Sequence, residues 1–352
     1  MNDTSPGFLW GALIPVNFGA ILLNMFFNRN RTLVCLLAMI VTFSAAFIGQ
    51  RPVHAAAWAP ADDRPAEPLR IMTTIRPLKL ILAEALGDEL VELVDLSVLM
   101  APDVSPHGFE PTPSQMARLR RADVILYNGL GLDDWAVRGA TGSQRTIGFV
   151  EVADIGEHDH HHHHDHHDHH DCDHHHGPVD EHFWLDVELV GAYAARCIGE
   201  LIALGRSDRR FTDEQIEKLH ERLIDFSRAT GEIDERARRR LEPFAGRRIV
   251  THHNVFSRIT ERYGLGEPVV LRPLTAVEPT PRDLRTAIET IRRENIPAIF
   301  IEPQFSSAAA ERIRDETNVK LIEVDPLGGR SETWSSFMES ILDAIEQGFR
   351  AN

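Results

Sequence analysis

Short apolar segments alternate with amphipathic ones along most of the chain. The apolar runs, rich in Leu, Ile and Val, are typical of strands buried in a parallel sheet, whereas the amphipathic segments repeat with a helical period. The predicted strands are 69–74, 90–98, 123–128, 146–152, 248–252, 268–271, 298–301 and 320–324. The predicted helices are 77–86, 112–121, 186–204, 212–241, 254–263, 281–294, 307–317 and 332–347. This alternation predicts an α/β fold with mostly parallel sheets, in which ligands bind at the carboxyl ends of the strands.

The longest predicted helix, 212–241, lies between two sets of strands. It contains no proline and a single glycine, Gly231, and Thr212 can cap its start with Gln215 three positions on. Thirty helical residues span about 45 Å. The sequence therefore predicts a rigid helix that joins two lobes, with two shorter helices broken at Gly231 as the alternative.

The length of 352 residues agrees with more than one domain. The strand sets place an N-terminal lobe at 56–210, the linking helix at 211–243 and a C-terminal lobe at 244–352. The formal net charge of −16 argues against nucleic acid and anionic membrane surfaces as partners, and it suits a protein that attracts cations.

The N-terminal segment 1–55 has the pattern of a secretory signal peptide. Two arginines precede the apolar run 33–48, and small residues ahead of Ala56 offer a cleavage site. A second apolar stretch, 8–28, precedes the arginines; Met25 as the true start would explain it, and a transmembrane helix is the alternative. We expect a soluble, exported, periplasmic protein. In such an oxidising compartment Cys172 and Cys197 could form a disulfide, although Cys172 could equally bind metal.

A histidine- and aspartate-rich run lies between Glu157 and Gly177. It holds 13 of the 19 histidines of the chain and no residue suited to a packed core, so we expect a disordered segment. Imidazole nitrogens bind Zn²⁺, Cu²⁺ and Ni²⁺, and the aspartates attract divalent cations generally. The run is therefore predicted to collect metal, with an expression tag or an inert loop as the alternative. Its candidate ligands are His158, His160, His161, His162, His163, His164, His166, His167, His169, His170, His174, His175 and His176.

Further candidate ligands lie in four loops that follow predicted strands or the histidine-rich run. His107 follows the second strand, His182 follows the run, His252 and His253 follow the first strand of the C-terminal lobe, and Asp325 follows its last strand. Three imidazoles and one carboxylate form a tetrahedral set that suits Zn²⁺, and a closed set binds metal without leaving a position for catalysis. The sequence also lacks HExxH, so a zinc hydrolase is disfavoured.

Five segments, in this order around a histidine-rich insertion, resemble the metal-binding receptors of zinc and manganese ABC importers. They are SPHGFEPTP, EHFWLDVE, THHNVF, IFIEPQFS and VDPLGG. The resemblance implies two (β/α)₄-type lobes joined by one long helix, with the metal held between them. It also implies that the protein is a monomeric receptor, not an enzyme, and that it delivers Zn²⁺ to a membrane permease.

The resemblance implies the ligand set His107, His182, His253 and Asp325, with His253 chosen over its neighbour because it precedes an aromatic residue by three positions. Manganese receptors resemble this pattern but carry Glu at the third position, so His253 favours zinc. Glu302 is expected to orient loops and not to bind metal. The sequence departs from the family at Ser105, often Asp, and at Glu181, often Pro. A periplasmic zinc chaperone or storage protein and a manganese receptor are the alternatives, and a periplasmic metallochaperone is a further expected partner.

Overall fold

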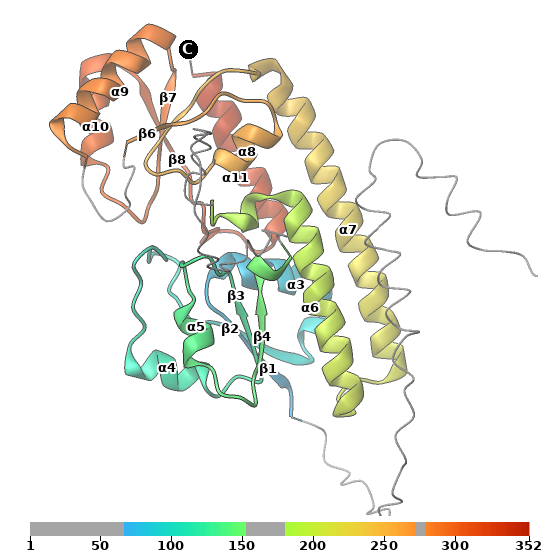
Figure 1. Cartoon of the computed structure of the whole chain (residues 1–352). Coiled ribbons are helices and arrows are strands. Elements are labelled where there is room, and N and C mark those ends of the chain that lie inside the picture. Colours follow the sequence, from blue (N-terminus) through green and yellow to red (C-terminus); the bar gives the residue numbers. More distant parts are fainter. Residues whose placement is uncertain (1–66, 153–179, 272–278, 352) are drawn as a thin grey trace, which may run out of the picture. The chain divides into compact units, whose positions relative to one another are not determined.

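The computed structural model describes residues 67–152, 180–271 and 279–351. Within these ranges it contains two four-stranded sheets, and each sheet is entirely parallel. Both have the same strand order, in which the first strand of the lobe lies between the second and the third. This confirms the predicted α/β class with parallel sheets (Figure 1).

The first sheet has the order β2-β1-β3-β4. Its strands are β1 (Leu69–Thr73), β2 (Val94–Val98), β3 (Val124–Tyr127) and β4 (Arg145–Gly148). Its helices are α3 (Arg76–Val91), α4 (Pro113–Leu119) and α5 (Trp135–Gly139). Proline in the first turn and a capping box at Thr112 fix the start of α4, which follows the loop of His107.

The second sheet has the order β6-β5-β7-β8. Its strands are β5 (Val250–Thr251), β6 (Val269–Val270), β7 (Ala298–Ile301) and β8 (Lys320–Glu323). Its helices are α8 (Ser257–Arg262), α9 (Pro281–Glu294), α10 (Ala308–Thr317) and α11 (Trp334–Phe349). Two of them end at asparagines with left-handed backbone, Asn295 and Asn318, the residue type that most readily replaces glycine there.

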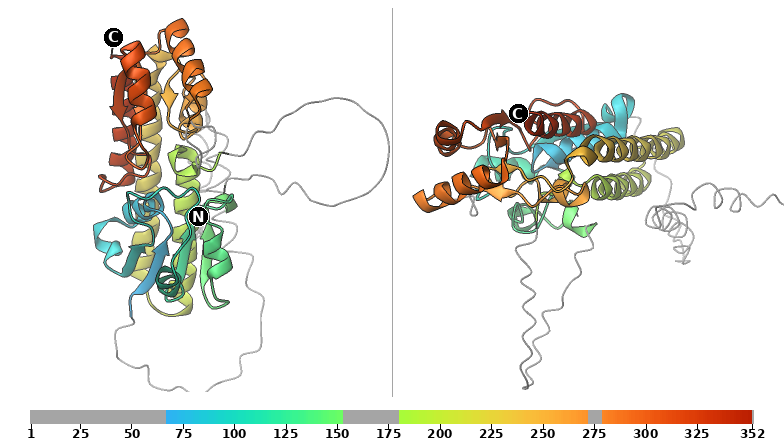
Figure 2. Two further views of the ribbon diagram at one scale, coloured as in Figure 1. Left: turned by 90° about the vertical axis from the view of Figure 1, so that its left-hand side faces the viewer. Right: turned by 90° about the horizontal axis from the view of Figure 1, so that it is seen from above.

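Two long helices, α6 (Val187–Ser207) and α7 (Asp213–Leu241), pack against each other beside the sheets (Figure 2). The capping box at Thr212 is formed with Gln215, acidic residues occupy the first turn of α7, and three arginines occupy its last turn, as the helix dipole favours. The helix is continuous through Gly231, so the alternative of a break there is wrong. Helix α7 contacts α3 and α6 of the first lobe and α11 of the second.

A single hydrophobic cluster extends through both lobes. It includes Ile81 of α3, Phe226 of α7, Phe300 of β7 and Ile341 of α11, each at most 2 % exposed. The linking helix is therefore part of the core that both sheets share. The predicted division into domains at 210 and 243 remains a prediction.

Some predicted boundaries are wrong. Residues 90 and 91 end α3 instead of starting β2, because Leu90 packs into the core from the helix. Strand β4 ends at Gly148 and is followed by a 3₁₀ turn, Phe149–Glu151. Strands β5 and β6 have two residues each, fewer than predicted, and α5 was not predicted.

Several predictions concern residues outside the described ranges: the signal peptide, the histidine-rich run and Cys172. The Cys172–Cys197 pairing therefore stays a prediction; Cys197 itself is buried in α6. Among the described helices none is long and apolar enough to cross a membrane.

Candidate metal centre

Three of the four predicted ligands meet at one point. His107 lies in the loop between β2 and α4, His182 directly precedes the 3₁₀ turn Phe183–Leu185, and His253 lies in the loop between β5 and α8. Gly108 supports the first loop with a positive φ of 72°, a conformation that glycine adopts without strain. Parallel strands bring their carboxyl ends to one edge of a sheet, which is why these loops can converge.

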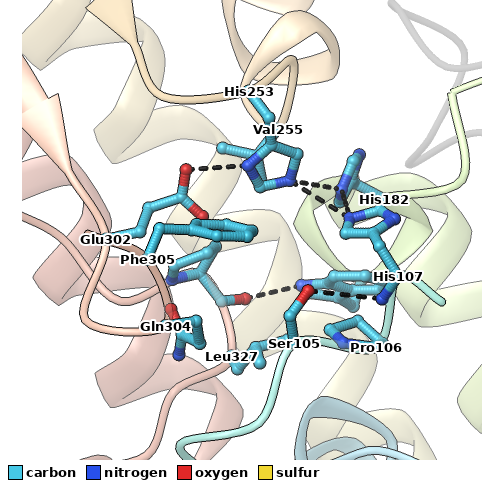
Figure 3. A pocket seen from close by; sticks show the side chains of 12 residues that line it. Ser105, Pro106, His107, His182, His253, Val255, Glu302, Gln304, Phe305 and Leu327 are labelled. Carbon is cyan, nitrogen blue, oxygen red and sulfur yellow. Dashed lines mark hydrogen bonds and ion pairs between the residues drawn. The ribbon is translucent and has the colours of Figure 1, made fainter. Parts of the chain in front are cut away.

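The Nε2 atoms of the three histidines form a nearly equilateral triangle (Figure 3). The separations are 3.2 Å from His107 to His253, 3.3 Å from His182 to His107, and 3.2 Å from His253 to His182. A tetrahedral zinc ion with Zn–N bonds of about 2.0–2.1 Å separates two nitrogen ligands by about 3.3–3.4 Å. The three nitrogens therefore already have the spacing that one tetrahedral ion requires.

Each histidine contacts a carboxylate through its other ring nitrogen. His182 Nδ1 lies 2.7 Å from Asp180 Oδ1, and His253 Nδ1 lies 2.8 Å from Glu302 Oε1. His107 Nδ1 lies 3.3 Å from Glu181 Oε1. A carboxylate can only accept a hydrogen bond, so it favours the tautomer with the proton on Nδ1. All three Nε2 lone pairs are then directed to the centre of the triangle.

The charges around the centre support this arrangement. Burial lowers the pKa of His253, against the opposing effect of Glu302, and so favours the neutral ring that can bind metal. Burial alone would raise the pKa of Asp180, but hydrogen bonds from His182 and Ser257 outweigh it and hold the value at about 2. Burial alone would raise the pKa of Glu181 as well, but the contact with His107 and the nearby His182 together lower it. Asp180 and Glu181 therefore provide negative charge just outside the nitrogen triangle.

The remaining walls of the pocket are mostly apolar. Trp184 and Phe305 place their rings edge-on to His182 and His253, with ring centroids 5.2 and 5.4 Å apart, and Val255 also lines the pocket. Such walls limit the access of water and strengthen electrostatic interactions inside the site.

Asp325, the fourth predicted ligand, is not among the atoms that lie within 4.8 Å of one another in the histidine group. Its Oδ1 accepts hydrogen bonds from Gln304 Nε2 at 2.8 Å and from the Leu327 amide at 3.0 Å. Its Oδ2 accepts one from the Gly329 amide at 2.8 Å. In this structure the carboxylate holds the turn that follows β8.

The neighbouring polar residues have other contacts. His252 is buried and packs edge-on against Phe305, outside the nitrogen triangle. Glu302 was expected to orient loops. Its carboxylate contacts His253 Nδ1, so it orients that metal-site histidine in particular. Asp180 and Glu181 form a second group of candidate ligands with His182, and sequence reasoning did not assign them a role. The departure from proline at Glu181 was the only signal for either.

The fold has two sheets of parallel strands and a long helix that contacts both lobes, and the site has a triangle of nitrogens. Together these features define a class: two-lobed receptors for divalent metals. The chain belongs to the family described as zinc-uptake complex component A, periplasmic, whose model matches residues 71–348. Members are metal-binding solute-binding proteins of ABC importers, which work with a membrane permease and are not enzymes.

Relatives with different metals in their names align with most of the chain. The manganese ABC transporter substrate-binding lipoprotein PsaA of Streptococcus anginosus is 24% identical over 324 residues, 87% of this chain and 97% of PsaA. The zinc-binding protein TroA of Treponema pallidum is 26% identical over 301 residues, 83% of this chain and 86% of TroA.

Solved structures show the same fold. The periplasmic zinc-binding protein TroA of Treponema pallidum superimposes with a TM-score of 0.65 at 24% identity, covering 80% of this chain and 99% of TroA. The crystal structure of ZnuA gives a TM-score of 0.64 at 23% identity, covering 80% and 99%. The predicted family and fold are thus confirmed, whereas the metal is a separate question.

Proposed function

We propose that this protein captures Zn²⁺ in the periplasm and delivers it to the permease of an ABC importer. The triangle of His107, His182 and His253 carries the proposal, because its nitrogen spacing matches tetrahedral zinc and each ring is oriented by a carboxylate. A receptor must bind metal tightly and release it unchanged. A site whose ligands all come from the protein is suited to that task.

The donor atoms favour zinc over manganese. Mn²⁺ prefers oxygen ligands and binds a given nitrogen site less tightly than Zn²⁺ does. This triangle is made of nitrogen alone. Its third position is His253, whereas manganese receptors with a similar pattern carry Glu there. Since TroA carries zinc in its name and PsaA manganese, a manganese receptor is the alternative that a direct comparison must address.

We propose Asp325 as the fourth ligand, reached by a rearrangement of its side chain or of the turn that it holds. A carboxylate has about four sites for accepting hydrogen bonds, and three donors contact this one, two on Oδ1 and one on Oδ2. One site on Oδ2 is therefore left for a metal.

The histidine-rich run, 158–176, is proposed to collect zinc in weak, exchanging contacts and to pass it to the triangle. The run ends at His176, four positions before Asp180 in the sequence, and this supports the role, since Asp180 begins the segment that carries His182. Release from a periplasmic metallochaperone to the run would be a second source of metal.

Metal stoichiometry tests the site. The chain starting at Ala56, its 158–176 deletion, His253→Ala and the control His220→Ala on α7 are exposed to equimolar Zn²⁺ and Mn²⁺, desalted and subjected to elemental analysis. We expect one zinc per chain in the deletion variant and in the deletion combined with His220→Ala, but none when it is combined with His253→Ala. Retained manganese would indicate a manganese receptor. Zinc that disappears with the run and survives His253→Ala would show that the triangle is not the site.

A further inference from the structure

The backbone segment that delivers His182 is anchored to the other lobe by one carboxylate. Asp180 Oδ1 accepts hydrogen bonds from the His182 amide at 2.9 Å and contacts His182 Nδ1 at 2.7 Å. Its Oδ2 accepts a hydrogen bond from Ser257 Oγ at 2.5 Å. Ser257 is the first residue of α8, in the C-terminal lobe. One side chain thus contacts a metal-site histidine with one oxygen and the opposite lobe with the other.

The next residue of α8 strengthens the same contact. Arg258 Nη2 donates to the Asp180 carbonyl at 2.5 Å, and Arg258 Nε lies 3.6 Å from Asp180 Oδ2. The guanidinium also stacks over the Phe183 ring, 4.4 Å from its centroid, and lies 3.7 Å from Asp186. The side chains of Asp180 and Arg258 are only 16% and 18% exposed, so solvent screens this ionic contact incompletely.

On the N-terminal side, the segment is held by the first sheet. Asn128 directly follows β3, and its Nδ2 donates to the Glu181 carbonyl at 2.9 Å. The backbone N–H of Asn128 in turn donates to the buried carboxylate of Asp133. The segment is therefore fixed at Glu181 by one lobe and at Asp180 by the other, and the position of His182 depends on both.

We propose that Asp180 is a positioning residue that couples metal binding at His182 to the docking of α8 against the N-terminal lobe. The proposal rests on the proposed function, since it assigns a role within the same site. A metal on Nε2 makes Nδ1–H a stronger donor and tightens its bond to Asp180. Asp180 held in that orientation keeps Oδ2 directed at Ser257. By reciprocity, the Ser257 contact favours metal binding to the same extent.

The contacts favour this role over direct ligation by Asp180. Its Oδ1 is bonded to His182, and its Oδ2 has Ser257 and Arg258 beside it. Binding a metal would require both oxygens to exchange partners. In addition, His182 Nε2, which faces the triangle, lies on the other side of the ring from the Nδ1 that contacts Asp180.

A double-mutant cycle on zinc affinity tests the coupling. The Zn²⁺ dissociation constant is measured by chelator competition for the wild-type chain, Asp180→Ala, Ser257→Ala and the double variant. We expect Asp180→Ala to weaken binding about 10–100-fold, the range for removing the partner of a metal-bound histidine. Ser257→Ala, which touches no ligand, should weaken it about 3–10-fold, and the double variant should be within about twofold of Asp180→Ala, because the serine acts through the aspartate.

Glu188→Gln provides the matched control. Glu188 of α6 contacts Arg262 of α8 at 3.3 Å, so it links the same lobes without touching a ligand histidine. Its zinc affinity should stay within about twofold of wild type, as expected for an exposed ion pair.

The coupling is overturned if Ser257→Ala binds zinc within twofold of wild type, or if its full effect persists in the Asp180→Ala background. If the Asp180 variants do not fold, the Ser257→Ala measurement alone decides, against the same control. Failure of the proposed function has a different signature: His253→Ala would then keep its zinc whatever the cycle shows.

Discussion

Replacing Glu302 by Gln should weaken zinc binding without destabilising the metal-free protein. The side chain of Glu302 is 1% exposed, and its Oε1 lies 2.8 Å from His253 Nδ1. Glutamine has nearly the same shape and can still accept the hydrogen bond through its oxygen. The substitution therefore removes the negative charge while it preserves the packing.

The expected loss is the difference between a charged and a neutral acceptor. A hydrogen bond to a charged group contributes about 1.5–3 kcal/mol and one between neutral groups about 0.5–1.5 kcal/mol, a difference of roughly 1–1.5 kcal/mol. This corresponds to a roughly five- to twelvefold weaker zinc affinity, at about 1.4 kcal/mol per tenfold. Without metal, the variant no longer has a buried charge to desolvate, so its free energy of unfolding should be unchanged or higher.

Chelator competition and urea unfolding in excess chelator measure the two quantities. Glu323→Gln is the control, because Glu323 is half exposed and forms a surface ion pair with Arg330, at 3.0 Å, away from the histidines. A Glu302→Gln variant whose zinc affinity stays within twofold of wild type would refute the reasoning. A large loss of stability in the metal-free form would also refute it, because Glu302 would then mainly stabilise the fold.

Three further predictions address the same site. Glu181→Gln should weaken zinc binding only about two- to fourfold by the same competition assay, because Glu181 is 27% exposed and its contact with His107 is longer, at 3.3 Å; a loss above tenfold would contradict this. Trp184→Phe removes the 2.7 Å bond from Nε1 to the Pro326 carbonyl and should lower the free energy of urea unfolding by about 1–3 kcal/mol; no change would refute the bond's contribution. Burial lowers the pKa of His253 below its ordinary 6.5, so the unfolded chain binds more protons than the folded one as pH falls. The stability of the metal-free protein should therefore decrease from pH 7.5 to 5.5. His253→Gln should reduce the dependence of the free energy of unfolding on pH.

The sequence predicted the fold where periodicity carries the information. The strands β7 and β8 and the helices α7 and α9 lie within a residue or so of their predicted limits, because each combines a clear apolar pattern with a capping or turn residue. The predictions were wrong where a short apolar run has no intrinsic period. Leu90 is such a case, since only its packing decides between helix and strand.

The site was predictable to a different extent. Position after a strand brought His107 and His253 into consideration, and position after the histidine-rich run did so for His182; the structure brings their nitrogens together. The carboxylates of Asp180 and Glu302 contact these rings across tertiary structure, and no spacing along the chain indicates such pairs. Asp325 shows the opposite case: the motif predicts a ligand, while its contacts are with the following turn.

The last helix has a consequence for how the chain reaches its folded state. Trp334, the first residue of α11, is fully buried and donates from Nε1 to the Trp184 carbonyl at 2.9 Å, and the neighbouring Ser335 amide donates to Glu84 of α3. Further along α11, Glu346 pairs with Arg240 of α7. Helix α11 therefore completes the interior around Trp184 and contacts α3 and α7. During synthesis the N-terminal lobe therefore cannot complete its native packing until α11 has been made and has left the ribosome, and the intervening chain must avoid aggregation until then.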